Sequence, residues 1–158
     1  MISIIIPTLD EVTSLPGLLD AMGQQRVAHE IIVADGGSRD RTLEIARNSG
    51  ARTLAARSGR GAGMALGAKA ARGDVLFFLH ADSALAPGAL DRIDEVLAAD
   101  ANIIGGNFRL VFDGGTKFSR RLPGSAHRSG CSGSITAIPG SSSAARSTNF
   151  SADFARYR

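Results

Sequence analysis

With 158 residues, 44% of them hydrophobic and 21% charged, the chain has the size and composition of one globular domain. This composition excludes wholesale disorder, a collagen-like repeat and a long coiled coil, and no apolar run approaches the roughly 20 residues of a membrane span. The net charge of +3 is uneven: residues 1–118 carry 12 basic against 14 acidic side chains, whereas residues 119–158 carry 6 Arg against one Asp. Because the larger part is slightly acidic and has no Trp or Tyr, we expect no nucleic-acid partner.

Two features bear on where the protein works. The N-terminus has no basic stretch before its first apolar residues, and Pro7 and Asp10 interrupt any signal-like run. Cys131 is the only cysteine, so an internal disulfide is excluded. We therefore expect a cytoplasmic protein.

The chain begins with a strand–helix–strand pattern. Runs rich in β-branched residues at 2–6 and 30–34 predict two buried strands. The apolar residues between them recur at helical spacing: Leu15, Leu18, Leu19 and Met22. Ser14 is the expected N-cap of this helix. Together these elements predict a βαβ unit.

The same alternation continues to residue 118. The further predicted elements are a helix over 39–48 with Ser38 as its N-cap, a short strand at 52–54, a helix over 64–71, a central strand at 75–79, a helix behind Pro87 and a half-exposed antiparallel strand at 107–112. Alternating units of this length predict a three-layer α/β sheet, with active residues at the carboxyl ends of its strands.

Residues 119–158 break this pattern. They include 10 Ser and have no apolar run or helical stripe long enough to predict an element. We therefore divide the chain into a sheet domain, residues 1–118, and a poorly ordered Ser-, Gly- and Arg-rich tail, residues 119–158.

Polar clusters follow three of the predicted strands, at residues 8–11, 35–40 and 80–82. Since the carboxyl ends of the strands in an open α/β sheet form its ligand crevice, we expect the clusters to converge on one site. His80 and Asp82 stand two apart at the end of an apolar strand, which would place both side chains on one side, within reach of a single divalent ion.

Each cluster alone also has a simpler explanation. The first could supply acidic residues to the first turn of a helix. The second could be only a Gly turn with a helix cap, and the histidine of the third could simply face solvent.

Three segments together resemble a known family. Residues 4–11, 32–42 and 73–83 look like family 2 glycosyltransferases of the GT-A fold in their order, spacing and strand context. The His-Ala-Asp sequence, followed by Gly-Gly-Asn-Phe-Arg-Leu at 105–110, resembles the subgroup named for arsenosugar biosynthesis. The resemblance covers residues 1–118.

This resemblance implies a Rossmann-like GT-A sheet and an inverting, metal-dependent transfer of sugar from a nucleoside-diphosphate sugar to an unknown acceptor. The residues that would hold the donor are Pro7, Thr8, Leu9, Asp10, Glu11, Asp35, Arg60, Ala81 and Asp82. Asp35 would accept a hydrogen bond from the base, and Arg60 would lie near the phosphates. Asp82 would hold Mn²⁺ or Mg²⁺ against the diphosphate, with His80, which replaces the family's first Asp, as the second metal ligand.

The sequence departs from the family pattern in two places. After the Gly-Arg pair the family carries a second Arg, a Gln and an Asn, whereas this chain has Ala62, Gly63 and Ala65. Residues 119–158 do not resemble the family's acceptor-binding half, which supplies the catalytic base, so the sheet is expected to be truncated on the acceptor side and the catalytic residue is unknown. The alternative to an active transferase is an inactive fragment that only binds the nucleoside diphosphate.

Two other enzyme classes fit less well. A Rossmann-type dinucleotide enzyme is disfavoured because Gly59, Gly61 and Gly63 follow the third predicted strand instead of the first. A sugar nucleotidyltransferase would carry a basic, Gly-rich loop after the first strand. Because a truncated sheet exposes an edge, we also expect a homo-oligomer, which light scattering would test.

Overall fold

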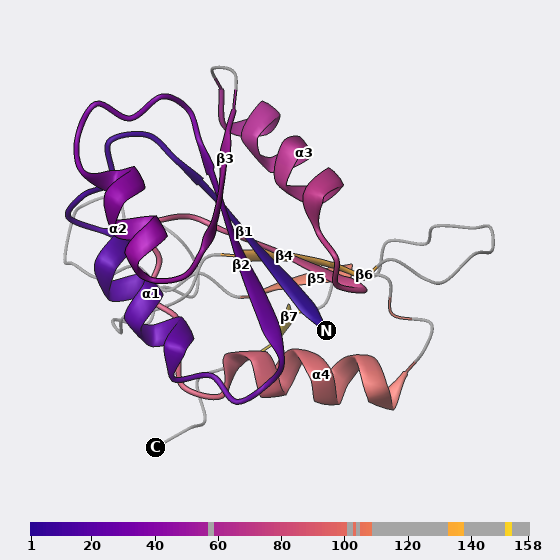
Figure 1. Cartoon of the computed structure of the whole chain (residues 1–158). Helices are drawn as coiled ribbons and strands as arrows, with labels where there is room; N and C mark the ends of the chain where they lie inside the picture. The colour runs from indigo at the N-terminus through magenta and orange to yellow at the C-terminus, as the bar shows by residue number, and fades with distance from the viewer. Residues whose placement is uncertain (57–58, 101–102, 104, 109–132, 138–150, 153–158) are drawn as a thin grey trace, which may run out of the picture.

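The computed structural model describes residues 1–56, 59–100, 103, 105–108, 133–137 and 151–152. The strands of this part are β1 (Ile2–Thr8), β2 (His29–Asp35), β3 (Arg52–Ala55), β4 (Val75–Leu79), β5 (Gly105–Phe108), β6 (Gly133–Ala137) and β7 (Ser151–Ala152). Its helices are α1 (Leu15–Gly23), α2 (Thr42–Asn48), α3 (Arg60–Ala70) and α4 (Ala89–Ala99). Figure 1 shows the helices arranged around a single twisted sheet.

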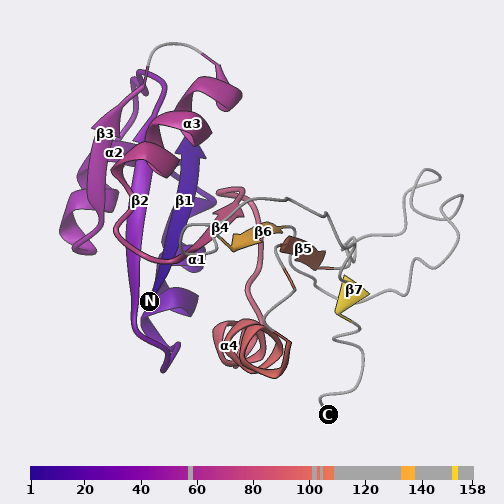
Figure 2. The ribbon, with the colours of Figure 1, turned by 90° about the vertical axis from the view of Figure 1, so that its right-hand side faces the viewer.

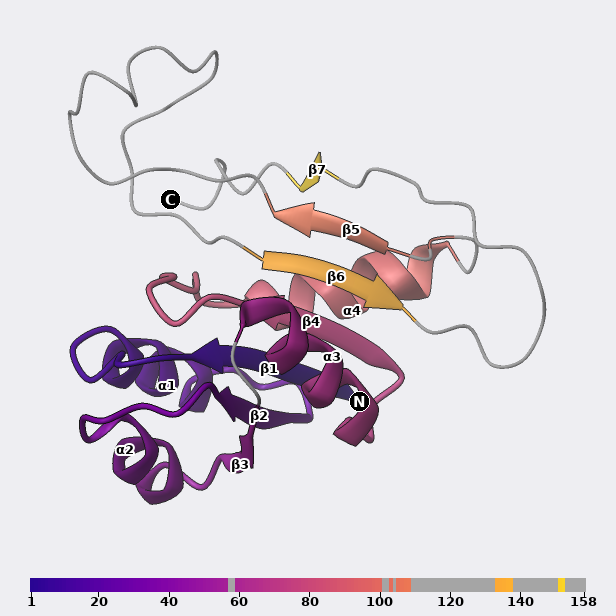
Figure 3. The same ribbon diagram turned by 90° about the horizontal axis from the view of Figure 1, so that it is seen from above.

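The sheet has the strand order β3-β2-β1-β4-β6-β5-β7 (Figure 3). β1 pairs in parallel with β2 and with β4, and β2 pairs in parallel with β3. β6 is antiparallel to both β4 and β5, and β7 pairs in parallel with β5. β4 is therefore the middle strand, as its hydrophobic sequence predicts. The parallel half brings the carboxyl ends of β1 to β4 to one edge of the sheet.

Helices cover both faces of the sheet, which confirms the predicted three-layer α/β architecture (Figures 1 and 2). On one face, Ile2, Ile4 and Ile6 of β1 share a core with apolar side chains of α1, α2 and α4. On the other face, α3 packs so closely that a Cβ atom on Gly67 would lie 2.4 Å from Cγ2 of Ile5. Because side chains alternate along a strand, burial on both faces requires the continuous apolar run of β1.

Most of the predicted elements before residue 100 are confirmed. The four strands predicted in this part are β1 to β4, and the helix predicted behind Pro87 is α4. The differences lie at helix starts: α2 begins at Thr42 and α3 at Arg60, not at residues 39 and 64. Ser14 is the N-cap residue of α1 as predicted, although it makes no side-chain capping hydrogen bond, whereas the N-cap of α2 is Arg41 and not Ser38. Among the described helices, none is long and apolar enough to cross a membrane.

Two strands lie where the sequence predicted no element. β6 comes from the Ser-rich residues 119–158 and sits inside the sheet, between β4 and β5, and β7 pairs at its edge. The antiparallel strand predicted at 107–112 corresponds to β5, which the structure places at 105–108; residues 109–112 lie outside the described part. The division of the chain at residue 118 remains a prediction.

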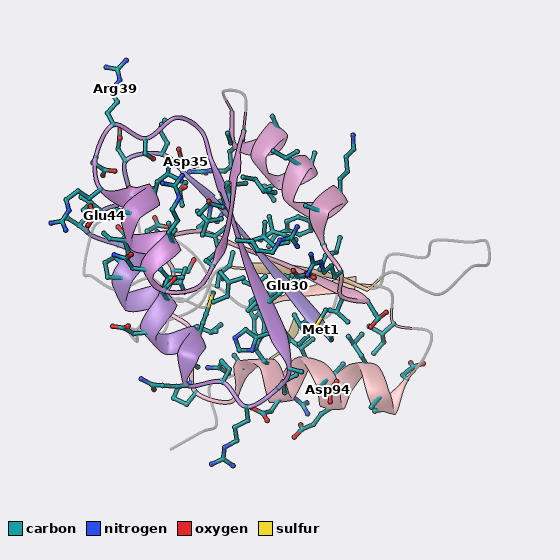
Figure 4. The ribbon with its side chains drawn as sticks, viewed as in Figure 1. Met1, Glu30, Asp35, Arg39, Glu44 and Asp94 are labelled. Atoms are coloured by element: carbon teal, nitrogen blue, oxygen red, sulfur yellow. The ribbon has the colours of Figure 1, made fainter. Side chains whose placement is uncertain are left out.

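At the amino-terminal edge of the sheet, the carboxylate of Glu30 joins neighbouring segments by hydrogen bonds and an ion pair (Figure 4). Its Oε1 accepts hydrogen bonds from Ser3 Oγ at 2.7 Å and from the Arg72 amide at 2.6 Å, and its Oε2 pairs with Arg52 Nη1 at 2.9 Å. The Gly73 amide in turn donates to Ser3 Oγ at 2.8 Å. Burial raises the pKa of Glu30, but the hydrogen bonds and the charge of Arg52 outweigh it and leave the pKa below its ordinary value.

Candidate functional site

The opposite, carboxyl-terminal edge carries a buried carboxylate, that of Asp35 at the end of β2 (Figure 4). Asp35 is 2% exposed and lies in register with Thr8, the last residue of β1. Its Oδ1 accepts hydrogen bonds from Thr8 Oγ1 at 3.0 Å and from the Ser38 hydroxyl, and its Oδ2 accepts the amides of Gly37 at 3.0 Å and Ser38 at 2.9 Å. A carboxylate offers about four acceptor positions, so this one is fully used.

These hydrogen bonds decide the ionisation of Asp35. Burial raises its pKa, but the donors from Ser38, Gly37 and Thr8 together outweigh burial and leave the pKa below its ordinary value. The group is therefore an anion at neutral pH. All four donors are hydroxyls or amides, and within the described residues no Lys or Arg side chain pairs with it.

The loop after β1 is held against the loop after β2 by reciprocal hydrogen bonds. The Asp10 amide donates to Ser38 Oγ at 2.9 Å, and the Arg39 amide donates to Asp10 Oδ1 at 2.7 Å. Asp10 has a φ of 56°, in the left-handed region, where Asp is among the better-tolerated residues. The Asp10 carboxylate is thus used to join the two loops, which Figure 1 shows side by side.

Asp40, which ends the predicted polar cluster at 35–40 but was given no role of its own, and Thr42, which lies just after that cluster, complete this junction. The Glu11 amide donates to Thr42 Oγ1 at 2.8 Å, and the Val12 amide donates to Asp40 Oδ2 at 3.1 Å. Thr42 is fully buried. The signal that could have found them is an Asp two residues before a Thr just ahead of a helix, an arrangement in which the Asp accepts the Thr amide.

The third polar cluster lies beyond the end of β4. The strand stops at Leu79, and residues 80–83 form a turn in which the Ser83 amide donates to the His80 carbonyl at 3.1 Å. The expectation that strand alternation places His80 and Asp82 on one side is therefore wrong in its reasoning, since neither residue belongs to a strand. Ala81 is 3% exposed and packs in the hydrophobic core, so its side chain is not available to a ligand.

Asp82 and His80 are the residues available for a metal at this turn. Asp82 is exposed and His80 half-buried, and no hydrogen bond within the described part of the chain occupies either side chain. The described residues contain no group of three or more His, Cys, Asp or Glu side chains placed to hold an ion. A hard divalent cation that takes most of its ligands from water and phosphate oxygens needs only one or two protein ligands, so this pair fits such an ion.

The start of α3 forms the remaining side of the edge. Gly59, with a φ of 114°, leads into α3, and the exposed Arg60 is its first residue. Inside α3, a Cβ atom on Gly63 would have Ala34 and Pro7 as its nearest neighbours, at 3.4–3.5 Å. Gly63 is therefore buried over the ends of β1 and β2 and has room for a Cβ atom.

The predicted donor residues thus fall into three sets. Thr8, Asp10 and Asp35 are brought together directly by hydrogen bonds or through Ser38. Leu9, on the same loop, is 58% exposed, and among the described residues Met1 is the other large apolar residue that is exposed. Two further predicted residues belong to the same stretch of chain: Pro7 lies in β1, and the Glu11 amide donates to Thr42 Oγ1. The third set lies at the ends of other elements of the same edge, and no hydrogen bond of the described residues joins its side chains to the first set: Arg60, His80, Ala81 and Asp82.

Sequence comparison decides the family. The profile of Glycosyl transferase family 2 matches residues 3–150. The chain belongs to this family. The match continues past residue 118, where the sequence analysis had ended the resemblance, and includes β6.

Two curated relatives of this family 2 chain illustrate the similarity. The chain is 39% identical over 89 residues to 4,4'-diaponeurosporenoate glycosyltransferase of Staphylococcus haemolyticus, over 51% of this chain and 24% of that protein. It is 41% identical over 93 residues to a PGL/p-HBAD biosynthesis glycosyltransferase of Mycobacterium bovis, over 54% of this chain and 36% of that protein. The matched part is well under half of either relative.

Solved structures of glycosyltransferases share the fold. Glucosyl-3-phosphoglycerate synthase of Mycobacterium tuberculosis, in complex with Mn²⁺, UDP-glucose and phosphoglyceric acid, matches with a TM-score of 0.65 and 20% identity, over 87% of this chain and 56% of that chain. TarS of S. aureus matches with a TM-score of 0.65 and 19% identity, over 77% of this chain and 40% of that chain. These matches confirm the predicted GT-A class of the α/β fold.

Proposed function

We propose that this protein transfers a sugar from a nucleoside-diphosphate sugar to an acceptor, with UDP as the first nucleotide to test. The observation that carries the proposal is the edge at the ends of β1 and β2, where Asp35 stands as a buried anion among hydroxyl and amide donors. The family match supports it, as do structural neighbours solved with UDP or UDP-sugars. That the matched relatives are glycosyltransferases favours an enzyme over a fragment that only binds nucleotide.

The structure adds one requirement to the role proposed for Asp35. Because its acceptor positions are filled, an N–H group of a nucleobase can bind only if one of the present donors gives way. Thr8 and Ser38 supply the two hydroxyl donors, and a hydroxyl can rotate its hydrogen elsewhere, whereas the two backbone amides are fixed. We therefore expect the base to replace one of these hydroxyls. The exposed Leu9 would offer apolar surface to the base ring.

The diphosphate is proposed to lie at the turn after β4. A bound Mn²⁺ or Mg²⁺ would neutralise charge on the departing nucleoside diphosphate. Asp82 and His80 are the side chains that would hold it, and Arg60 would approach the phosphates from the start of α3. An inverting transfer also needs a carboxylate to take the proton of the acceptor hydroxyl, and no residue is assigned to that role.

Titration calorimetry of UDP and GDP, with and without Mn²⁺, tests the proposal. For the unchanged chain we expect binding of at least one nucleotide that strengthens when the metal is present. For Asp82→Ala we expect the metal-dependent part of the affinity to disappear, because the exposed carboxylate would be the chief protein ligand.

The matched control is Asp94→Ala, which removes another exposed carboxylate, on α4 (Figure 4). This variant should bind as the unchanged chain does. If neither nucleotide binds the unchanged chain, or if Asp82→Ala retains the metal effect in full, the proposed donor site is wrong.

A further inference from the structure

Three consecutive amides of the loop after β1 are held by side chains of the loop after β2 and of Thr42, the first residue of α2. The Asp10 amide donates to Ser38 Oγ at 2.9 Å, the Glu11 amide to Thr42 Oγ1 at 2.8 Å and the Val12 amide to Asp40 Oδ2 at 3.1 Å. The ladder between β1 and β2 ends at Thr8, and α1 begins only at Leu15. Between those points, these three bonds from outside the loop hold residues 10–12, and a turn in which the Glu11 carbonyl accepts the Ser14 and Leu15 amides carries the chain into α1.

Asp40 is the centre of this arrangement. Its Oδ2 accepts the Val12 amide, while its Oδ1 accepts the Thr42 amide at 2.9 Å and also the Thr42 hydroxyl. The donation from the hydroxyl leaves Thr42 Oγ1 turned as an acceptor toward the Glu11 amide. Through this chain of hydrogen bonds, one carboxylate fixes two successive peptide groups of the other loop.

We infer that Asp40 is a positioning residue for the donor site: it holds the segment that carries Leu9, Asp10 and Glu11 in the conformation that binds nucleotide. The inference rests on the proposed function, because those residues are the ones proposed to contact the donor. Hydrogen bonds from Thr42 and from the Val12 amide lower the pKa of Asp40 against a smaller effect of burial, so the carboxylate is charged at neutral pH.

A simpler role for Asp40 would be to cap the start of α2. Its bond to the Thr42 amide, two residues on, is typical of such a turn. A cap alone would affect only the stability of α2, because the Val12 amide belongs to the other loop. The two roles therefore differ in what happens to the loop after β1 and to nucleotide affinity.

The test compares Asp40→Asn with the unchanged chain in two measurements. Hydrogen exchange of the nucleotide-free protein, read by NMR at the Glu11 and Val12 amides, reports whether the loop is held. Calorimetric titration with UDP and GDP in Mn²⁺ reports whether donor affinity follows. The side-chain amide of Asn presents a donor at one of the two positions where the carboxylate presents an acceptor. At least one of the hydrogen bonds, from the Val12 amide or from Thr42, is therefore lost.

We expect faster exchange at Glu11 and Val12 and a Kd raised about tenfold, as when only about a tenth of the molecules hold the binding conformation. Thr42→Val, which keeps the shape of a fully buried side chain and removes its hydroxyl, should change both measurements in the same direction. This second variant keeps the inference testable if Asp40→Asn fails to fold. Asp94→Asn, a matched change on α4, should leave the Kd within about twofold.

The outcomes separate the inference from the proposed function. If the unchanged chain binds neither UDP nor GDP, the proposed function fails and the inference fails with it. If the unchanged chain binds but folded Asp40→Asn and Thr42→Val bind equally well, the inference alone is overturned. The inference is also overturned if affinity falls while exchange at Glu11 and Val12 stays unchanged.

Discussion

The two edges of the sheet each carry one partly or wholly buried carboxylate, and the two are satisfied in different ways. At the amino-terminal edge, Glu30 accepts from Ser3 and from the Arg72 amide and pairs with the charged Arg52. At the carboxyl-terminal edge, Asp35 accepts four hydrogen bonds from neutral groups and has no cationic partner among the described residues. In both cases hydrogen bonds keep the pKa low against burial.

This difference indicates that the Glu30 network is structural, whereas the Asp35 network belongs to a binding site. The Glu30 network contains its own counter-charge and joins strands whose positions the sheet already sets. The Asp35 network leaves a net negative charge at the strand ends, between two loops that have no other regular structure. A buried charge that neutral donors alone stabilise is costly to keep, and such positions are more frequent at functional sites than elsewhere.

The largest expected effect comes from exchanging each carboxylate for its amide. Asp35→Asn should weaken nucleotide binding by on the order of 100-fold, because it removes the charged hydrogen bond, worth about 1.5–3 kcal/mol, that the carboxylate is proposed to accept from the base. Calorimetric titration with UDP and GDP in Mn²⁺ measures this change.

Glu30→Gln is the matched change at the other edge. It should lower the free energy of unfolding, measured with urea, while nucleotide affinity stays the same for the folded protein. If Glu30→Gln weakened binding as much as Asp35→Asn, the distinction between the two edges would be lost.

Smaller effects, on the free energy of unfolding, are expected from two Gly→Ala substitutions at sites that differ in the space available for a Cβ atom. At the amino-terminal edge, a Cβ atom on Gly73 would lie 2.5 Å from the Met1 carbonyl oxygen and 2.9 Å from the Ser3 amide. Since these are backbone atoms, Gly73→Ala should destabilise the fold by about 1–3 kcal/mol. Urea unfolding measures the difference.

Gly63→Ala serves as the comparison, near the carboxyl-terminal edge. Its new Cβ would be no closer than 3.4 Å to any neighbour, and Ala is favoured over Gly inside a helix by about 1 kcal/mol. This variant should be as stable as the unchanged chain or slightly more stable. A strong destabilisation would show that α3 sits closer to the end of β1 than the structure has it.

The smallest expected effect is on the stability of the folded protein at acidic pH. Because both carboxylates have a lower pKa in the folded protein than their ordinary values of 4.5 for Glu30 and 3.8 for Asp35, the ionised forms favour folding. That contribution is complete above these values and is lost as the pH falls below them toward the folded-state pKa. Urea midpoints should therefore drop between neutral pH and about pH 3, and should drop less in Glu30→Gln and in Asp35→Asn. Equal slopes in all three proteins would contradict the low pKa values.

The sequence predicted the parallel half of the sheet well, because each of its strands and helices has a recognisable hydrophobic pattern of its own. The apolar runs of β1, β2 and β4 are long enough to be buried on both faces, and α1 shows clear helical spacing. β6 was missed for the opposite reason. Its sequence, GSITA, has little apolar character, and it is a strand because β4 and β5 pair with it on both sides. Such long-range pairing leaves no local signal.

The site was predicted in outline but not in its connections. The polar clusters after β1 and β2 do converge, as the topology of a parallel sheet requires. Ser38 was predicted to cap a helix because Ser often does so. In the structure, its hydroxyl donates a hydrogen bond to Asp35, and its oxygen accepts one from the Asp10 amide. Asp40 was predicted as part of the polar cluster at 35–40, but its contact with the Val12 amide was not, because Val12 is 28 residues away. A sequence shows which groups can accept hydrogen bonds, but not which donors the fold brings to them.

The place of β6 also bears on how the chain reaches this fold during synthesis. β1 to β4 can pair once residues 1–79 have emerged, but β5 has no partner beside β4 until residues 133–137 follow. The outer side of β4 therefore stays an open edge for part of translation, and open edges of this kind are where nascent chains misassociate. The middle of the finished sheet is therefore among the last parts to form. Although β6 is short and polar, we expect substitutions that weaken its pairing to lower the expression yield strongly.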